Sequence, residues 1–398
     1  MYCLIMKSIT NISFSGKKVF IRVDFNVPFD EFDEITDNSR IVAALPTINY
    51  VLSNGGSCIL ASHLGRPKGF DQGLSLKKII PELKNLLKKH VFFSNDCIGE
   101  QAVKYSGQLK AGEILLLENL RFHKEETLAD EAFARRLSNL ADVYINDAYG
   151  TTHREHASTA TIAKFFTEKC AGILLQNEIQ SLQKLMHKPK RPVTAIIGGA
   201  KVSSKISVIS NILDFVDNLI IGGGMAFTFV KQKGGSIGDS IFEADRFNEC
   251  SEVLHLANKK NVEIFLPVDI IAANDFSNNA TKQTLRANDI PVGWQGLDIG
   301  PKSIDVFKNI VKKSNTILWN GPMGVFEMPS FEKGTEAIAE VVAETTQKGA
   351  YSIIGGGDSV AAIKKFNLQN KVSFISTGGG AMLEGLEGKI LPGIKALD

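Results

Sequence analysis

The 398-residue sequence lacks the features that mark several classes of protein. Its five cysteines are odd in number and well separated, which argues against a disulfide framework or a zinc site and fits a reducing cytoplasm. Lys and Arg number 45 against 43 Asp and Glu, with no run of basic residues, so a role at nucleic acid or a membrane surface has little support. No uninterrupted apolar run approaches the roughly 18 residues of a membrane span. The start, MYCLIMKSI, has no basic segment before its short apolar run and is not typical of a signal peptide.

What is present suits a soluble globular protein: 44% of the residues are hydrophobic and 22% are charged. At roughly 100–200 residues per domain, the length predicts two domains. Apolar, mostly continuous runs predict strands covered on both faces. They lie at residues 18–25, 57–62, 114–118, 142–147, 193–198, 218–222, 262–268, 315–319, 351–355 and 372–376.

Segments of helical periodicity fill the gaps between these strands. They lie at 40–53, 75–89, 130–140, 203–214, 245–259, 302–313 and 332–346. Alternating strands and helices predict an α/β fold with parallel sheets and right-handed crossovers. A further helical segment, ILLQNEIQSLQKLMH at 173–187, follows no strand and ends before KPKRP, where two prolines stop it. We interpret it as an interdomain helix.

Basic side chains follow the strands of the first half. Ligands of open α/β sheets bind outside the carboxyl ends of the strands, so these positions are candidates for a binding site. The candidates are Arg22, Asp24, Asn26, Arg40, His63, Arg66, Arg121, His123, His153, Arg154 and His156. A lone arginine more often pairs with a nearby acid, but four equivalent strand ends indicate a small substrate with several negative charges. The stretch HREH lacks the spacing of HExxH and further ligands, so a metal there is not expected.

Glycines follow the strands of the second half instead. The runs are IIGGAKVSSK, IIGGGMAFT, WNGPMGVFE, IIGGGDSVA and ISTGGGAML, each of which is expected to open a helix. Glycine lets backbone approach a phosphate closely, and helix starts attract anions. Lys201 and Lys205 are spaced i,i+4 and are predicted to share a helix face. None of the runs is a P-loop or a clear GxGxxG motif, but five together indicate a polyphosphate such as a nucleotide.

Asp358 is the exception, because it puts a negative charge into such an anion site. Two interpretations stay open: it caps the helix, or it binds a cation that accompanies the phosphates.

The residues alone therefore suggest an enzyme of phosphoryl transfer between a small polyanion and a nucleotide. A nucleotide-dependent dehydrogenase would need a clear GxGxxG with an acidic residue about 20 positions on, which is not found. A scaffold protein would not need arginine clusters on one domain and phosphate loops on the other.

These motifs resemble the phosphoglycerate kinase family along nearly the whole chain. The matching stretches include RVDFNVP, ASHLGRP, LLLENLRFH, NDAYGTTHREHAS, IIGGAKVSSK, GWQGLDIGP, WNGPMGVFE, GGGDSVAA and STGGGAMLE. The resemblance implies reversible phosphoryl transfer between 1,3-bisphosphoglycerate and ADP, giving 3-phosphoglycerate and ATP, with Mg²⁺. The attacking group is a carboxylate, which carries no proton, so no general base is expected.

The resemblance also implies roles for individual residues. Glycerate binding falls to Asp24, Phe25, Asn26, Arg40, His63, Leu64, Gly65, Arg66, Arg121 and Arg154. Nucleotide binding falls to Lys201, Lys205, Gly223, Gly296, Asn320, Glu327, Gly356, Gly357, Asp358 and Ser359, with Asp358 at Mg²⁺. Catalysis falls to Arg40, Lys201, Gly357 and Gly380, which would stabilise the transferring phosphoryl group.

Its implied fold is two Rossmann-like lobes. We expect a substrate domain at 1–170, an interdomain helix and linker at 171–190, and a nucleotide domain at 191–375. The segment 376–398 is expected to return to the first domain. The family also implies a cytoplasmic monomer with small-molecule substrates.

Overall fold

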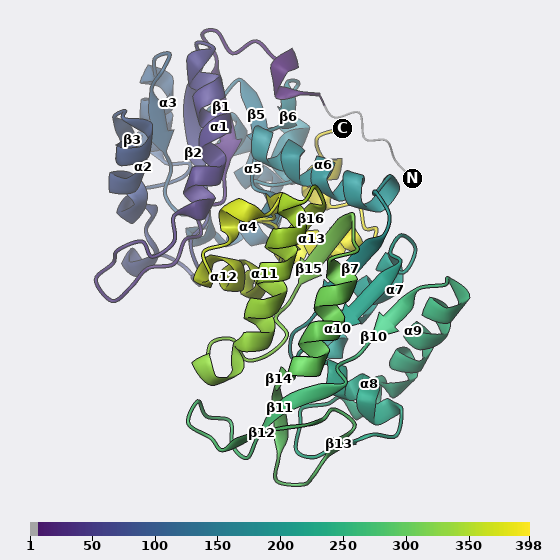
Figure 1. Ribbon diagram of the computed structural model, residues 1–398. Helices are drawn as coiled ribbons and strands as arrows, with labels where there is room; N and C mark the ends of the chain where they lie inside the picture. The colour runs from purple at the N-terminus through teal and green to yellow at the C-terminus, as the bar shows by residue number, and fades with distance from the viewer. Residues whose placement is uncertain (1–6) are drawn as a thin grey trace. The chain divides into compact units, whose positions relative to one another are not determined.

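The computed structural model describes residues 7–398, so Cys3 and most of the start discussed above lie outside the described residues. The chain divides into two compact units, the first reaching Gln180 and also including Ile390–Asp398, and the second spanning Ser181–Lys389. The helix α6 (Ile173–His187) carries the chain from one unit to the other (Figure 1).

The first unit is built on a six-stranded sheet in which every pairing is parallel. In spatial order its strands are β3 (Val91–Phe93), β4 (Ile114–Leu116), β2 (Ser57–Ala61), β1 (Lys18–Arg22), β5 (Val143–Asn146) and β6 (Lys169–Ala171). Its other helices are α1 (Ser39–Ser53), α2 (Ile80–Leu87), α3 (Glu100–Gln108), α4 (Lys124–Thr127), α5 (Glu131–Ser138) and α14 (Pro392–Lys395). All residues of β2 are buried, as expected of a strand with both faces covered.

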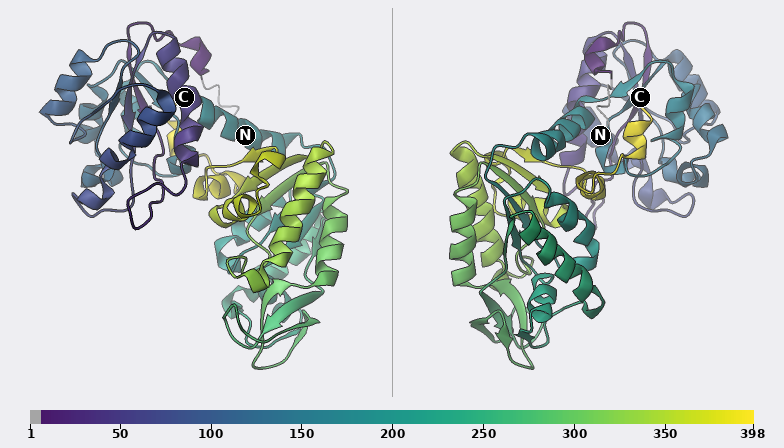
Figure 2. Two further views of the ribbon diagram at one scale, coloured as in Figure 1. Left: turned by 60° about the vertical axis from the view of Figure 1, so that its left-hand side comes forward. Right: turned by 90° about the vertical axis from the view of Figure 1, so that its right-hand side faces the viewer.

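The last residues of the chain pack onto this first unit. The N–H of Gly393 donates to the carbonyl of Thr152 at 2.8 Å, and Lys169 Nζ donates to the carbonyl of Ala396 at 2.8 Å. Figure 2 shows this C-terminal segment in yellow beside the teal strands of the unit.

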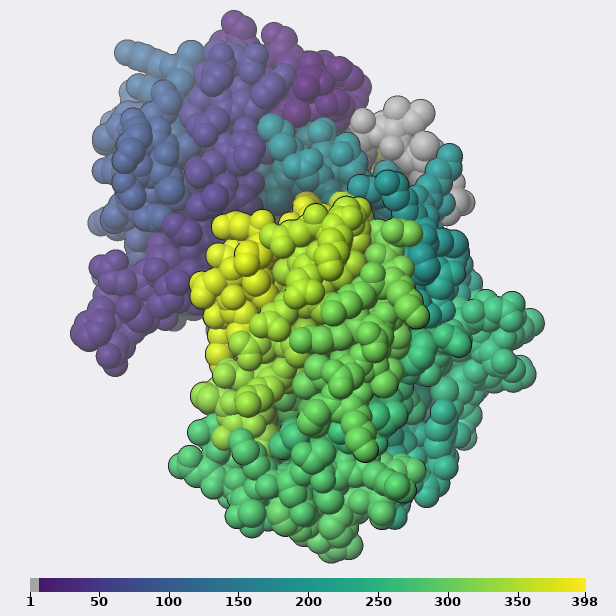
Figure 3. Space-filling model, viewed as in Figure 1, coloured from purple at the N-terminus to yellow at the C-terminus, as the bar shows by residue number. Residues whose placement is uncertain are grey.

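The second unit contains another parallel six-stranded sheet. In spatial order its strands are β10 (Glu263–Phe265), β8 (Asn218–Ile221), β7 (Val193–Ile197), β15 (Thr316–Asn320), β16 (Tyr351–Gly355) and β17 (Phe374–Ile375). Its helices are α7 (Ile206–Ile212), α8 (Ala226–Gln232), α9 (Phe247–Lys259), α10 (Pro301–Val311), α11 (Lys333–Gln347), α12 (Gly357–Lys365) and α13 (Gly380–Leu386). Helices α10 and α11 run side by side in Figure 1 and form much of the near surface of this unit in Figure 3.

Two smaller sheets complete the second unit. One is antiparallel, in the order β12 (Lys282–Arg286), β11 (Asp269–Ala273) and β14 (Gln295–Ile299). The other pairs β13 (Asp289–Ile290) with β9 (Ser236–Ile237).

The predicted α/β class and parallel sheets are confirmed, but several details were wrong. The antiparallel sheet was not predicted, because β12 is almost wholly exposed and carries no apolar run. The predicted strand at 262–268 is shorter, ending at Phe265. The helix at 173–187 was expected to follow no strand, but β6 comes directly before it. The run WNGPMGVFE does not open a helix directly: a loop and the short 3-10 turn Pro329–Phe331 come before α11.

Each unit has its own apolar core, formed between its six-stranded sheet and the helices that pack against it. In the first, fully buried side chains of β1, β2 and α1 pack together, including Ile21 and Ile48. In the second, Trp319 of β15 is fully buried against α11, and its indole N–H donates to the carbonyl of Gly321 at 2.8 Å. These cores fix the strands whose carboxyl ends carry the functional loops.

Candidate functional sites

In both sheets, successive strands are added first toward one edge and then toward the other, and this order reverses between two central strands. In the first unit this point lies between β1 and β5, where Arg22 and Asn146 are partners. In the second it lies between β7 and β15, where Ile197 and Asn320 are partners. Such switch points leave a crevice at the carboxyl ends of the strands, where ligands of α/β sheets bind.

Polar residues predicted after β1, β2 and β4 and at the start of α1 form one hydrogen-bonded group. Arg40 pairs with Asp24 through NH1 and Oδ2 at 3.0 Å, and also donates to the carbonyl of Asn26 at 3.1 Å. The side-chain oxygen of Asn26 accepts the N–H of Gly65 at 2.8 Å. Arg121 NH1 donates to the carbonyl of Gly65 at 2.6 Å. The structure thus brings these five residues together from four segments of the chain.

Phe25 and Leu64 lie behind the polar residues of this group rather than among them. Both side chains are buried in the core. The N–H of Phe25 donates to Ser62 Oγ at 2.8 Å, and that of Leu64 donates to the Asn119 side-chain oxygen at 3.2 Å. Because their amides are already bonded within the protein, these two residues support the loops that carry the polar groups.

The two buried histidines of this group are uncharged at neutral pH. Burial, followed by the charges of nearby arginines, holds the pKa of His63 well below its usual range. Burial and the same kind of charges lower the pKa of His156 to about 4. Burial and the neighbouring charge of Arg22 also lower the pKa of Arg121. The group therefore holds an excess of positive charge, which an anion would relieve.

Glu126 is a part of this cluster that the sequence did not reveal. It is fully buried, and its carboxylate accepts the Ser158 hydroxyl at 2.7 Å and the Ser158 N–H at 2.9 Å. The same hydroxyl accepts Arg22 Nε at 2.8 Å, and Arg22 NH2 lies 3.3 Å from His63 Nδ1. A chain of hydrogen bonds thus joins a buried carboxylate to the basic cluster. The sequence carries no signal for this burial, because Glu126 stands in the polar stretch KEET.

Arg66 and Arg154 extend the cluster to the surface. Both are exposed, and both charges act on the guanidinium of Arg121, whose pKa they help to lower. Because they are exposed, the side chains of these two arginines can move to contact a bound ligand.

The second unit contains a cavity of about 600 Å³, within the range of small-molecule sites. Four of the predicted nucleotide residues line it: Gly223, Gly296, Glu327 and Asp358. The rest of the lining is largely apolar and includes Phe227 and Met323, which the sequence did not single out. A Cβ on Gly296 would lie 2.1 Å from Cζ of Phe227, so only glycine leaves room for that ring.

Lys201 and Lys205 do not share a helix face, contrary to the prediction. A 3-10 turn, Val202–Ser204, separates them, and neither lysine has helical backbone angles. Lys201 is exposed, whereas Lys205 Nζ donates to the carbonyls of Gly198 at 2.6 Å and Asn320 at 3.1 Å. Burial lowers the pKa of Lys205 to about 8, an effect that the charge of Asp358 opposes. The lysine is thereby held at the switch point between β7 and β15.

At IIGGGDSVAAI, the capping interpretation of Asp358 is wrong. Gly356 occupies the N-cap of α12, with φ of 87°, and no side chain caps the helix. Asp358 is exposed in the first turn and faces the cavity. Ser359 is buried instead, and its Oγ accepts the N–H of Gly321. The side chain of Asn320 donates to the carbonyl of Gly355 at 3.0 Å.

The remaining predicted residues lie at helix starts of the second unit. Gly357 is the first residue of α12, and a Cβ there would meet nothing within 4 Å, so this point is open. Gly380 is the first residue of α13. Within residues 7–398, no group of metal-binding side chains includes the HREH histidines. In the same range, no helix combines the length and the apolar composition that a membrane span requires.

Comparisons with known proteins agree with this arrangement. The family model described as phosphoglycerate kinase matches residues 9–389. The cytosolic phosphoglycerate kinase 3 of Arabidopsis thaliana is 51% identical, covering 96% of each chain. The phosphoglycerate kinase of Porphyromonas gingivalis is 48% identical over 98% of this chain and 99% of that protein.

Solved structures show the same likeness. That of phosphoglycerate kinase from Coxiella burnetii matches with a TM-score of 0.89 at 40% identity, covering 98% of both chains. That of the enzyme from Pyrococcus horikoshii matches with a TM-score of 0.85 at 30% identity. With its two α/β units, its arginine cluster and its glycine-lined cavity, the chain belongs to the phosphoglycerate kinase family.

Proposed function

We propose that the chain catalyses reversible, Mg²⁺-dependent transfer of a phosphoryl group between 1,3-bisphosphoglycerate and ADP. The observation that carries the proposal is the basic cluster of the first unit. There, the charges of Arg22 and Arg121 act on two uncharged histidines, His63 and His156, and the charge of Arg40 acts on His63. A compact ligand with several negative charges, such as 3-phosphoglycerate, would relieve the repulsion among these cations.

Within the cluster, the proposed roles follow from burial and hydrogen bonding. Asp24, Asn26, His63 and Gly65 form the floor that receives the glycerate, while Phe25 and Leu64 hold that floor from the core. Arg66, Arg121 and Arg154 bind the distal phosphate, as planar donors of paired hydrogen bonds. Arg40, fixed against Asp24 at 3.0 Å, is assigned to the phosphoryl group being transferred.

Glu126 is proposed as a positioning residue for the cluster. Through Ser158 it holds Arg22, and Arg22 contacts His63. A buried carboxylate with two good hydrogen bonds can retain a buried guanidinium without meeting the substrate itself.

In the second unit, the apolar cavity is proposed to hold the nucleoside, with Glu327 toward the ribose. Gly223 and Gly296 give the nucleoside room. The phosphates would lie toward Lys201, Lys205 and the helix-start amides of Gly356, Gly357 and Gly380. Asn320 and Ser359 hold the loop ends in place.

Asp358 fits a hard cation, because it is an exposed carboxylate at the cavity edge that makes no helix cap. When bound there, Mg²⁺ would neutralise charge on the nucleotide phosphates.

The reaction needs no general base. The attacking atom is a carboxylate oxygen of 3-phosphoglycerate, which forms a bond to the terminal phosphorus of ATP as the bond to ADP breaks. Catalysis then rests on positioning and on charge stabilisation by Arg40, Lys201 and the glycine amides. Because the two sets of residues belong to different units, we propose that the units close together for an in-line transfer that excludes water.

We further propose that the protein acts on these small molecules as a cytoplasmic monomer, without nucleic acid or membrane. The cytosolic location named for the Arabidopsis and wheat relatives supports the compartment.

A coupled assay tests the proposed reaction. Purified protein is mixed with 3-phosphoglycerate and MgATP, and a dehydrogenase that consumes the acyl phosphate reports turnover through loss of NADH absorbance. We expect turnover that depends on both substrates and on Mg²⁺. No turnover, with the dehydrogenase shown to be active, would overturn the assignment and leave a scaffold role.

A further inference from the structure

The first unit holds a second cluster of chemically active side chains, which the proposed reaction does not use. Asp96 and Cys97 lie in the loop between β3 and α3, and His123 lies just before α4. Since β3 and β4 are neighbours in the sheet, the two loops leave its edge side by side. Among residues 7–398, these three are the one group of three or more metal-binding side chains whose ligand atoms all lie within 4.8 Å of one another.

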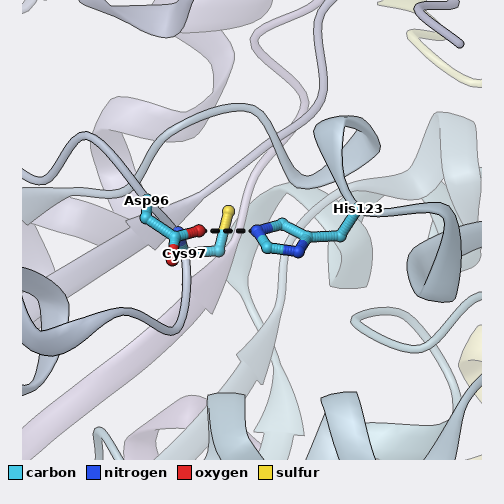
Figure 4. Close-up of side chains that lie close together, drawn as sticks. All are labelled: Asp96, Cys97 and His123. Carbon is cyan, nitrogen blue, oxygen red and sulfur yellow. Dashed lines mark hydrogen bonds and ion pairs between the residues drawn. The ribbon is translucent and has the colours of Figure 1, made fainter. Parts of the chain in front are cut away.

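The three donor atoms converge on one point. His123 Nε2 lies 2.6 Å from Asp96 Oδ1, and Figure 4 shows the Cys97 thiol beside the line that joins them. Cys97 is fully buried, while Asp96 and His123 are partly exposed, so the point is open to solvent on one side. A cavity of about 280 Å³ adjoins it, lined by Asp96 and His123 together with Glu125 and Asp130.

We propose that Asp96, Cys97 and His123 form a binding site for a Zn²⁺-like divalent cation, one that needs a single cysteine and is therefore compatible with the wide separation of the cysteines in the sequence. Thiolate and imidazole select borderline-soft ions over Mg²⁺, which prefers oxygen ligands and water. Three protein ligands with one open position are typical of an accessible zinc centre. One thiolate and one carboxylate also neutralise the charge of a divalent ion.

Binding requires three local changes. The thiol proton passes to water, so Cys97 gives up its hydrogen bond to the carbonyl of Glu118 at 2.9 Å. The ion takes the place of the hydrogen bond between Asp96 and His123. Asp96 Oδ1 and His123 Nε2 move apart from 2.6 Å, and the Cys97 sulfur, which lies within 4.8 Å of both, adjusts its position, so that all three reach the roughly 3.5 Å spacing that metal–ligand bonds of 2.0–2.3 Å allow. Arg136 at the cavity edge opposes the cation, but its NH2 is engaged by the carbonyl of Ile98 at 3.0 Å.

Binding of the cation at this site should shift the loops that are proposed to bind the glycerate. The side chain of Glu118 accepts the N–H of Asn119 at 2.8 Å, and the side-chain oxygen of Asn119 accepts those of Leu64 and Arg121. A shift of the Glu118 carbonyl is therefore passed to the segment that carries Arg121. If the proposed function holds, bound Zn²⁺ raises the KM for 3-phosphoglycerate.

Titration with Co²⁺, a spectroscopic substitute for Zn²⁺, tests the site independently of activity. We expect a thiolate-to-cobalt charge-transfer band in the full-length protein, removed by Zn²⁺. Cys97→Ser should abolish the band, His123→Gln should weaken binding by more than about tenfold, and Cys250→Ser, a buried cysteine of the second unit, should leave both unchanged.

Circular dichroism of each metal-free variant verifies its fold, and His123→Gln serves if Cys97→Ser does not fold. A wild-type protein without the band, or a band that persists in Cys97→Ser or is equally strong in His123→Gln, would overturn the site. If Co²⁺ binds but Zn²⁺ leaves the KM for 3-phosphoglycerate unchanged, the link to the glycerate loops is wrong.

Discussion

The two units are built on the same kind of parallel sheet, but different chemical groups form their sites. At the strand ends of the first unit, charged side chains are fixed by hydrogen bonds, as between Arg40 and Asp24. At those of the second, glycine backbone and apolar side chains enclose a cavity, as Gly296 and Phe227 do. A small anion offers little beyond charge and is best held by cations, whereas a nucleotide offers a large apolar base and needs space. The strand ends, not the fold, thus distinguish the two ligands.

The largest expected effect comes from the charged site. Arg40→Ala should lower kcat by about 10³ or more, because a well-placed arginine in phosphoryl transfer contributes that much, with a smaller change in KM. Arg154→Ala is the matched comparison, since this exposed arginine is assigned to substrate binding and should mainly raise the KM for 3-phosphoglycerate. Steady-state kinetics measures both. An unchanged kcat in Arg40→Ala, or an unchanged KM in Arg154→Ala, would contradict the corresponding role.

The next effect concerns what holds the charged site together. Glu126→Gln removes the buried charge that faces Arg22 through Ser158, and should lower the free energy of unfolding by about 3 kcal/mol. Urea denaturation measures it. Glu131→Gln, which breaks only an exposed pair with Lys164, is the control and should change little. If the two variants have the same free energy of unfolding, Glu126 does not hold the charged site together.

The cavity should respond to volume rather than to charge. Gly296→Ala puts a methyl group where Phe227 lies, so the ring must move into the nucleotide space. We expect the KM for MgATP to rise about tenfold, a loss of about 1.4 kcal/mol of binding, while the KM for 3-phosphoglycerate stays constant. Gly107→Ala, where a Cβ meets nothing within 4 Å, should behave like the wild type. A change in both KM values would show that the cavity is not confined to the nucleotide.

The smallest effect is a pH dependence confined to the second unit. With a pKa of about 8, Lys205 loses its charge as the pH rises from 7 to 9, from about nine-tenths protonated to about one-tenth. The KM for MgATP should therefore rise several-fold over this range. The KM for 3-phosphoglycerate should stay nearly constant, because arginines keep their charge. Lys205→Arg should flatten the first profile, and an equally steep profile in that variant would exclude Lys205 as its cause.

The sequence predicted those parts of the molecule that follow from local pattern. Strands buried on both faces, such as β2 and β15, are continuous apolar runs in any context. The basic and glycine-rich strand ends were likewise visible in the sequence.

Features that depend on distant residues could not be predicted in this way. Lys205 is held by the carbonyl of Asn320, 115 residues away, which no helical spacing reveals. Glu126 looks like a surface residue until Ser158 and Arg22 surround it. The strand β12 has no apolar run, because only its neighbour β11 is well buried.

The division of labour between the units is the central claim, and hydrogen exchange with each ligand alone tests it most directly. We predict that 3-phosphoglycerate slows exchange in segments 24–26, 63–66 and 119–123, whereas MgADP slows it in segments 199–205, 321–327 and 356–359. Slowed exchange at 24–26 or 63–66 with MgADP alone, and none at 356–359, would contradict the account.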